Sequence, residues 1–229
     1  MLNFKKMTAI GAASVVALLA AGSAQANGFA NGSFETASSA ANPPGGVTYF
    51  AAGWLAAPTG NPALLSDVAH TGLHSALLTV PNGFGGSTLF QNSVDHGGLA
   101  PLGAEAVGAK PKLTFWAKGD VSTTGNVLFA LRYLDGIGNI LGGSGNQFFQ
   151  NQINPTTWSQ ISFQAAAIPA GTKAVFLEMN TAVGPLLDGR SNAVYIDDIS
   201  LAPVPEPETY ALMLAGLAAV GAMVRRRRA

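Results

Sequence analysis

Three groups of side chains in this sequence have types that could support hydrolysis, and none has the complete pattern. His70 and His74 have the spacing of a helical zinc pair, but Thr71-Gly72 between them indicates a turn. Gly142-Gly143-Ser144-Gly145 lacks the spacing and the strand-to-helix context of a nucleophile elbow. Acids for glycoside cleavage are also present, although a chain with twelve acids supplies such pairs by chance. They are Asp95, Glu105, Asp120 and Glu178. We therefore predict that the chain is not an enzyme, with a glycan-acting hydrolase as a distant alternative.

The aromatic residues that could stack on a sugar ring divide into two sets. Trp54, Trp116 and Trp158 stand in short patterns of structural character, so we predict that they are core residues. The better-placed aromatic residues are Tyr49, Phe50, Phe148 and Phe149. The last two lie in a loop, 145–152, where amide side chains flank both rings. The pair predicts a ligand-binding loop, and the alternative is that one ring anchors the loop to the domain.

These residues must be positioned by strands. Between residues 27 and 202 no helical period of useful length occurs, whereas short alternating or β-branched runs recur between turn signals. Asp135-Gly136 between two apolar runs is a strong hairpin signal. The expected strands are 75–80, 87–91, 112–118, 126–134, 158–164, 172–179 and 193–201. This spacing predicts an all-β domain, a jelly-roll β-sandwich, over residues 27–202.

The charge of the chain limits its possible partners, and the absence of cysteine limits its chemistry and its sources of stability. The formal net charge is zero, and six of the twelve basic residues lie in the two termini, which leaves a mildly acidic body. Nucleic acid normally binds a clustered basic surface, so we exclude it as a partner. The absence of cysteine removes disulfides and thiolate chemistry, so stability must come from core burial.

The N-terminus has the three regions of an export signal. A basic start, 1–6, precedes the small and aliphatic run 7–22 and the small-x-small pattern Ala24-Gln25-Ala26. Cleavage after Ala26 would begin the mature chain at Asn27. The alternative is a permanent membrane anchor, but the apolar run is short for a bilayer span. We predict a signal peptide, 1–26, removed by signal peptidase.

The C-terminus also has three parts in a fixed order. Val204-Pro205-Glu206-Pro207-Glu208 is held extended by its prolines. The apolar run 211–224 would be about 21 Å long as a helix, so it spans a bilayer only if flanking residues extend it to about 209–224. The run ends at Arg225, Arg226, Arg227 and Arg228, which would hold the C-terminus in the cytoplasm and the body outside. We therefore predict a single transmembrane helix.

Residues 204–228 resemble a PEP-CTERM sorting signal, in which Val204, Pro205, Glu206 and Pro207 form the signature motif. The resemblance implies that residues 203–229 are recognised by exosortase, a membrane protease-transpeptidase that removes the helix. It also implies a Gram-negative host that makes extracellular polysaccharide. The alternative, a plain tail anchor, explains the helix and the arginines but not the Pro-Glu-Pro. The expected location is the inner membrane first, and then the cell surface or extracellular matrix.

Short patterns along residues 27–202 resemble the galactose-binding-like jelly rolls that include many carbohydrate-binding modules. They are Asn31-Gly32-Ser33-Phe34-Glu35, Gly53-Trp54, 70–75, 113–118, Thr157-Trp158 and 194–201. The resemblance implies the fold more strongly than a ligand.

In that family a structural calcium often joins the first and last strands, and the resemblance places its carboxylates at Glu35 and Asp198. The residues themselves indicate a bulge. Val194 and Ile196 share one strand parity, and Ile199 and Leu201 share the other, so a regular strand cannot bury all four. A carboxylate turned inward at such a bulge would need a cation or a hydrogen-bonded partner. The alternative is two solvated aspartates at a strand end.

Together these patterns predict an exported, non-catalytic surface or extracellular-matrix protein that adheres to polysaccharide, with Tyr49, Phe148 and Phe149 as the candidate contacts. A structural or adhesive matrix protein without glycan affinity is the alternative. At most one structural calcium is expected as a cofactor.

Overall fold

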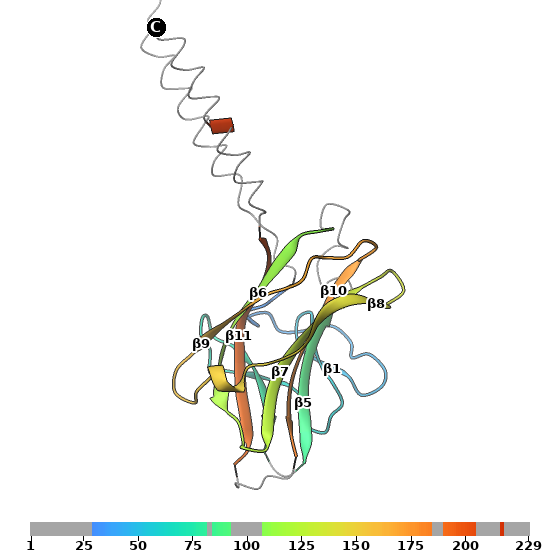
Figure 1. The fold of residues 1–229 in the computed structure, drawn as a ribbon. Coiled ribbons are helices and arrows are strands. Elements are labelled where there is room, and N and C mark those ends of the chain that lie inside the picture. The colour runs from blue at the N-terminus through green and yellow to red at the C-terminus, as the bar shows by residue number, and fades with distance from the viewer. Residues whose placement is uncertain (1–28, 82–83, 93–106, 185–189, 205–215, 218–229) are drawn as a thin grey trace, which may run out of the picture.

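The computed structural model describes residues 29–81, 84–92, 107–184, 190–204 and 216–217. The predicted signal peptide and most of the predicted sorting tail lie outside these residues. The described part is built from two antiparallel sheets with almost no helix (Figure 1). No helix among the described residues has the length and hydropathy needed to cross a membrane.

Sheet A, as we name it here, has six strands and carries the first and the longest hairpins. Its spatial order is β1 (Thr48–Ala51), β2 (Trp54–Ala56), β5 (Gly85–Asn92), β10 (Ala174–Val183), β7 (Gly125–Leu134) and β8 (Ile140–Phe148). Because β8 pairs with β7 alone, it forms one edge of the sheet. The short helix η2 (Gln150–Gln152) follows β8 directly.

Sheet B has five strands and ends with the last strand of the domain. Its order is β3 (Leu64–Ser66), β4 (Ser75–Val80), β11 (Asn192–Val204), β6 (Lys110–Asp120) and β9 (Ser159–Gln164). The β11 strand pairs with β6 as far as Val204, so residues 203 and 204 are still part of the sheet.

Alternating side chains build the core between the two sheets. In β6 the inward positions include Leu113, Phe115 and Ala117, all fully buried. Phe115 packs edge-on against Phe129 of β7, with ring centroids 5.6 Å apart, which joins the two sheets. The described residues thus form the all-β sandwich that the sequence predicts, with a single hydrophobic core.

The seven strands expected from the sequence correspond to β4, β5, β6, β7, β9, β10 and β11. The ends of β4 are as expected, and those of the other six are shifted. The prediction missed four other strands. Three of them, β1 to β3, have only three or four residues each, too few to show a period. The fourth, β8, includes residues 145–148 of the predicted loop 145–152. Its sequence, Ile-Leu-Gly-Gly-Ser-Gly-Asn-Gln-Phe, is rich in glycine and does not alternate, so it has no strand period.

Candidate binding site

A bulge in β11 places two neighbouring carboxylates in different surroundings. The register of β11 against β6 shifts between Asp197 and Ser200, and Asp198 has a left-handed backbone with φ of 51°. The bulge changes which residue parity faces the core, so the apolar side chains before it and after it both point inward and are buried. These residues are Val194, Ile196, Ile199 and Leu201. The predicted bulge is therefore confirmed.

Asp197 is the carboxylate that turns inward, and it is fully buried. Its Oδ2 accepts hydrogen bonds from the backbone N–H groups of His70 (2.8 Å) and Thr71 (3.2 Å), and its Oδ1 accepts one from the N–H of Asp198 (2.7 Å). Burial raises the pKa of Asp197, although the N–H groups of His70, Thr71 and Asp198 act in the opposite direction. The inward carboxylate thus has hydrogen-bonded partners.

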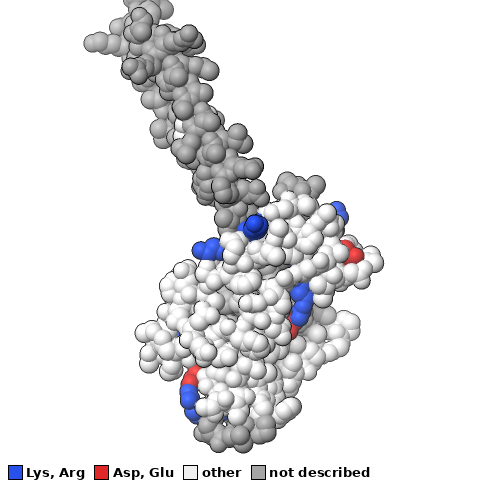
Figure 2. Space-filling model, viewed as in Figure 1, with Lys and Arg blue, Asp and Glu red and all other residues white. Residues whose placement is uncertain are grey.

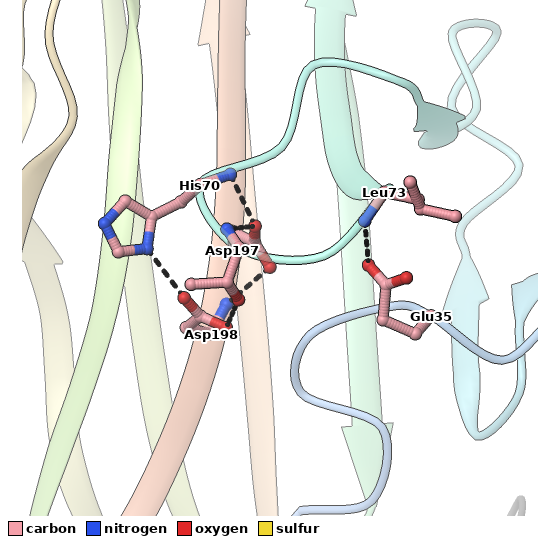
Figure 3. Close-up of polar contacts among 6 residues, drawn as sticks. Glu35, His70, Leu73, Asp197 and Asp198 are labelled. Atoms are coloured by element: carbon pink, nitrogen blue, oxygen red, sulfur yellow. Dashed lines mark hydrogen bonds and ion pairs between the residues drawn. The ribbon is translucent and has the colours of Figure 1, made fainter.

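Asp198 and Glu35 hold the same loop, 70–74, from opposite ends (Figure 3). Asp198 bonds the Nδ1 of His70 at 2.7 Å and accepts a bond from the hydroxyl of Thr71 at 2.6 Å. The Oε1 of Glu35 accepts bonds from the backbone N–H groups of His74 (2.8 Å) and Leu73 (2.9 Å), which lower the pKa of Glu35. The two residues expected to hold calcium therefore lie against one loop.

The arrangement does not by itself form a metal site. Within the described residues no group of three or more His, Asp or Glu side chains is placed to hold a metal ion. Each of the two expected ligands already receives N–H or O–H donors from loop 70–74. His70 and His74 also face different carboxylates, Asp198 and Asp67 respectively. Calcium stays a prediction from the sequence resemblance.

The three tryptophans occupy two kinds of position. Trp54 is fully buried, and its indole N–H lies 3.0 Å from the carbonyl oxygens of both Ala30 and Asn31, as expected of a core residue. Trp116 is only partly buried, because the inward positions of β6 are Phe115 and Ala117. The prediction that Trp116 and Trp158 are core residues is wrong, since both remain partly exposed around the His70 ring.

The two phenylalanines of the predicted binding loop have separate roles. Phe149 is buried and packs against Phe115, with ring centroids 5.1 Å apart, so it anchors the chain after β8 to the core. Phe148, by contrast, is 54% exposed and ends β8 on the edge of sheet A. Of the two, Phe148 alone presents its ring to solvent. Phe50 is partly buried and stacks on Phe34 of the opening motif.

Tyr49 and Phe148 belong to one surface, the face of sheet A that points away from the core, which we name the outer face. The register relates the residues of this face across the strands: Tyr49 lies opposite Leu55, which is fully buried, and Leu55 lies opposite Phe90. Phe90 lies opposite Glu178 of β10. At the far side Leu128 of β7 lies opposite Phe148.

The centre of the outer face combines aromatic rings with polar groups. The rings of Phe90 and Phe176 lie 5.7 Å apart, and the guanidinium of Arg132 lies 5.4 Å from the ring centre of Phe176. Arg132 Nη1 donates to Glu178 at 2.7 Å, with about 30% of each side chain exposed. Beside this pair, the Asn180 amide donates to the Thr88 hydroxyl at 2.6 Å.

The outer face is neutral and slightly hollowed. A depression of about 180 Å³ lies beside Arg132, between β7 and the bulged β8, and Asn146 forms part of its wall. The side of the whole molecule seen in Figure 2 carries few charged side chains, and these stand apart on a largely uncharged surface. Partly exposed rings, hydroxyls and amides, with one balanced ion pair, suit the chemistry of a polyhydroxylated ligand.

Sequence reasoning missed Phe90, Phe176, Arg132 and Asn180 as members of a surface. The signal that could have found them is strand parity. In the run 174–183 the inward positions include Val175, Leu177 and Met179, which leaves Phe176 and Asn180 on the opposite side. A large aromatic residue on the outward parity of a central strand indicates a covered or ligand-binding face.

Comparison with known proteins identifies the tail and shows the fold. Residues 203–228 match the PEP-CTERM protein-sorting motif, which indicates export and sorting to the cell surface. Comparison with curated proteins found no match to this chain.

Among solved structures, the enzymatically active domain of bacteriophage CBA120 tailspike protein 4 is similar with a TM-score of 0.54 and 16% identity, covering 78% of this chain and 21% of that one. This chain therefore corresponds to about a fifth of the tailspike chain. The CBM22-1 xylan-binding domain of Paenibacillus barcinonensis Xyn10C has a TM-score of 0.45 and 14% identity, covering 80% and 99% of the two chains. A family 22 carbohydrate-binding module of Clostridium thermocellum Xyn10B has a TM-score of 0.45 and 18% identity, covering 78% and 96%.

Proposed function

We propose that this protein is an exported, exosortase-sorted, non-catalytic surface or matrix protein whose outer face on sheet A binds polysaccharide. The observation that carries the proposal is the central group of Phe90, Phe176, Arg132 and Glu178, flanked by Tyr49 and Phe148. An ordinary solvated sheet face would carry scattered charged residues and not a row of aromatic rings.

The polar groups of this face are arranged for hydroxyl ligands. Arg132 and Glu178 hold each other in place, so each offers a fixed donor or acceptor direction to a sugar hydroxyl. Asn180, two residues after Glu178 on β10, and the buried Thr88 of β5 form a second fixed pair. Because the charges balance, the face suits a neutral or weakly acidic glycan better than a strongly charged one.

The sorting motif accounts for how such a domain would reach its ligand. We propose that the signal peptide 1–26 is cleaved after Ala26 and that a helix at about 209–224 holds the chain in the inner membrane. Exosortase would then remove this tail and release the domain to the surface or the extracellular matrix.

The proposal is tested by binding of residues 27–202 to soluble and insoluble polysaccharides, including the exopolysaccharide of the host, with calcium and with chelator. This segment contains the whole described core, from Phe29 to Leu201. We expect saturable binding that weakens about tenfold in Tyr49→Ala or Phe148→Ala, as loss of one stacking contact predicts.

Phe84→Ala is the matched control, because Phe84 is 83% exposed and precedes β5 instead of lying in the outer face. If no polysaccharide binds, or if Phe84→Ala weakens binding as much as the face variants do, the proposal is wrong.

A structural calcium at Glu35 and Asp198 is tested by the melting midpoint of the same segment. If calcium joins these residues, the midpoint rises with added calcium and falls with chelator. An identical midpoint in both conditions means that the hydrogen bonds to loop 70–74 hold the two ends of the domain without an ion.

The alternative function, a structural or adhesive matrix protein without glycan affinity, is favoured by a separate observation. Strand β8 is an uncharged edge with exposed apolar side chains, and such edges associate with other chains.

A further inference from the structure

The hairpin of β7 and β8 gathers exposed apolar side chains along one edge of the molecule. Ile137 is 86% exposed, Ile140 62%, Leu141 40% and Phe148 54%. These residues lie within twelve positions of the chain, and all but Ile137, at the hairpin tip, belong to β8. Scattered surface apolar residues are normal, but a row of them along one element marks a contact surface.

The backbone of this edge is also available for pairing. Because β8 pairs with β7 alone, backbone N–H and C=O groups along its outer side have no partner strand, although the carbonyls of Ser144 and Gly145 accept hydrogen bonds from the Gln147 amide and the Ser144 hydroxyl. The other sheet edges in the described part of the chain are shorter, with four residues in β1, three in β3 and six in β9. The β9 edge exposes Gln and Ser side chains instead of large apolar ones.

None of the usual side-chain protections of an edge strand is present here. Residues 136–151 contain no Asp, Glu, Lys, Arg, His or Pro. Natural edge strands normally carry such residues to prevent pairing with other chains. Two irregularities in the register with β7, at Ala130/Arg132 and at Tyr133/Leu134, do break β8 into short regular stretches. They limit the length of any new ladder and so make an association weak and reversible.

We propose that β8 joins this protein to a second copy of itself, edge to edge and antiparallel, so that sheet A continues across the pair. A second copy fits because an uncharged strand meets an identical uncharged strand without repulsion. Side chains of the two β8 strands pack beside one another in the pair, and the outer faces of the two sheets, with Phe148 on them, become one continuous surface.

The first test uses sedimentation to measure the mass of the full chain in mild detergent. The protein concentration runs from about 1 µM to about 1 mM, a range that covers the dissociation constants of weak dimers. We expect a dimer that dissociates on dilution and whose dissociation constant rises at least tenfold in the double variant Ile140→Lys/Leu141→Lys. The matched control is Leu73→Lys, since Leu73 is 71% exposed but lies in loop 70–74. Association through the apolar tail would be unaffected by either variant.

The second test uses the absence of cysteine from the chain. Ser144→Cys places a single thiol at the centre of β8, where the two copies of an antiparallel pair lie opposite each other, and Gln160→Cys places one on the β9 edge as the control. Mild oxidation is expected to yield disulfide-linked dimers much faster from Ser144→Cys. The proposal is overturned if the chain stays monomeric throughout, if the lysine double variant associates like the natural chain, or if the two cysteine variants cross-link equally. Neither sedimentation nor cross-linking depends on glycan binding. Failure of the dimer proposal can therefore be told apart from failure of the proposed function.

Discussion

Asp197 and Glu35 accept hydrogen bonds from the same loop, yet their pKa values move in opposite directions. For Asp197 burial outweighs the three N–H donors, so the pKa is raised. Glu35 is exposed, and the N–H groups of His74 and Leu73 stabilise its charged form, so its pKa is lowered. Solvent access at each residue decides the sign.

The lowered pKa of Glu35 predicts a pH dependence of stability. A carboxyl group with a lower pKa in the folded state contributes stability above its unfolded pKa, ordinarily 4.5, and loses it as the pH falls through the folded pKa. We expect Glu35→Gln to lower the free energy of unfolding near neutral pH and to flatten its decline on acidification. Urea unfolding between neutral pH and about pH 3 measures the free energy of unfolding of both chains. The difference between variant and natural chain is taken at each pH, because both contain Asp197 and its opposite effect then cancels. Equal slopes in both chains would show that these hydrogen bonds do not stabilise the fold.

The two rings at the end of β8 predict different costs of truncation. Phe149→Ala removes a buried ring that packs on Phe115 and Phe129, which costs about 3 to 5 kcal/mol of unfolding free energy. Phe148→Ala removes a ring that is half exposed, so we expect a cost below about 1 kcal/mol. Chemical denaturation of both variants measures the difference. Similar costs would contradict the division into an anchoring ring and a surface ring.

At the scale of the element, the bulge of β11 and the opening segment depend on each other. The N–H of Ile199, just after the bulge, donates to the carbonyl of Gly32 at 2.9 Å. A Cβ atom at position 32 would collide with the carbonyl oxygen of Ile199. The opening segment therefore passes so close to the last strand that no side chain fits between them.

Gly32→Ala is accordingly expected to destabilise the domain by at least about 2 kcal/mol, because the backbone of one of the two segments must move. Gly184→Ala is the matched control, since a Cβ there has no neighbour within 4 Å among the described residues and its φ is not positive. Thermal or urea unfolding compares the two variants. A stable Gly32→Ala variant would mean that the opening segment can leave β11 without cost.

At the scale of the whole molecule, the sorting motif and the sheet share two residues. The motif match begins at residue 203, and β11 still pairs with β6 at Pro203 and Val204. The Pro-Glu-Pro tripeptide thus follows the folded domain without a linker. An enzyme that reads the tripeptide must work close to the end of sheet B.

This proximity predicts that a short Gly-Ser spacer between Val204 and Pro205 increases tail removal in the host, because the enzyme then meets less of the folded domain. The ratio of processed to unprocessed chain in membrane fractions measures it. The melting midpoint of the domain, which should not change, is the control. Slower or unchanged processing would indicate that the enzyme already has full access to the junction.

Local patterns predicted much of this protein because their causes are local. Alternation in 112–118 and 126–134 identified β6 and β7, and Asp135-Gly136 identified the turn after β7. The parity conflict around Asp197 identified the bulge before any partner strand was known. The sorting tail is read in the same way, since its parts act in a fixed linear order.

Tertiary structure alone decided which residues share a surface. Phe90, Arg132 and Phe176 come from three strands, and only the order β5, β10, β7 brings them together. Likewise, Phe148 and Phe149 are adjacent and chemically identical, and the position of the β8 edge over the core determines which ring is buried. The sequence by itself therefore determined the sorting motif, the fold class and most strands, because these depend on linear order, periodicity and composition. The binding face and the free edge depend on strand order, which arises from contacts between residues far apart in the chain.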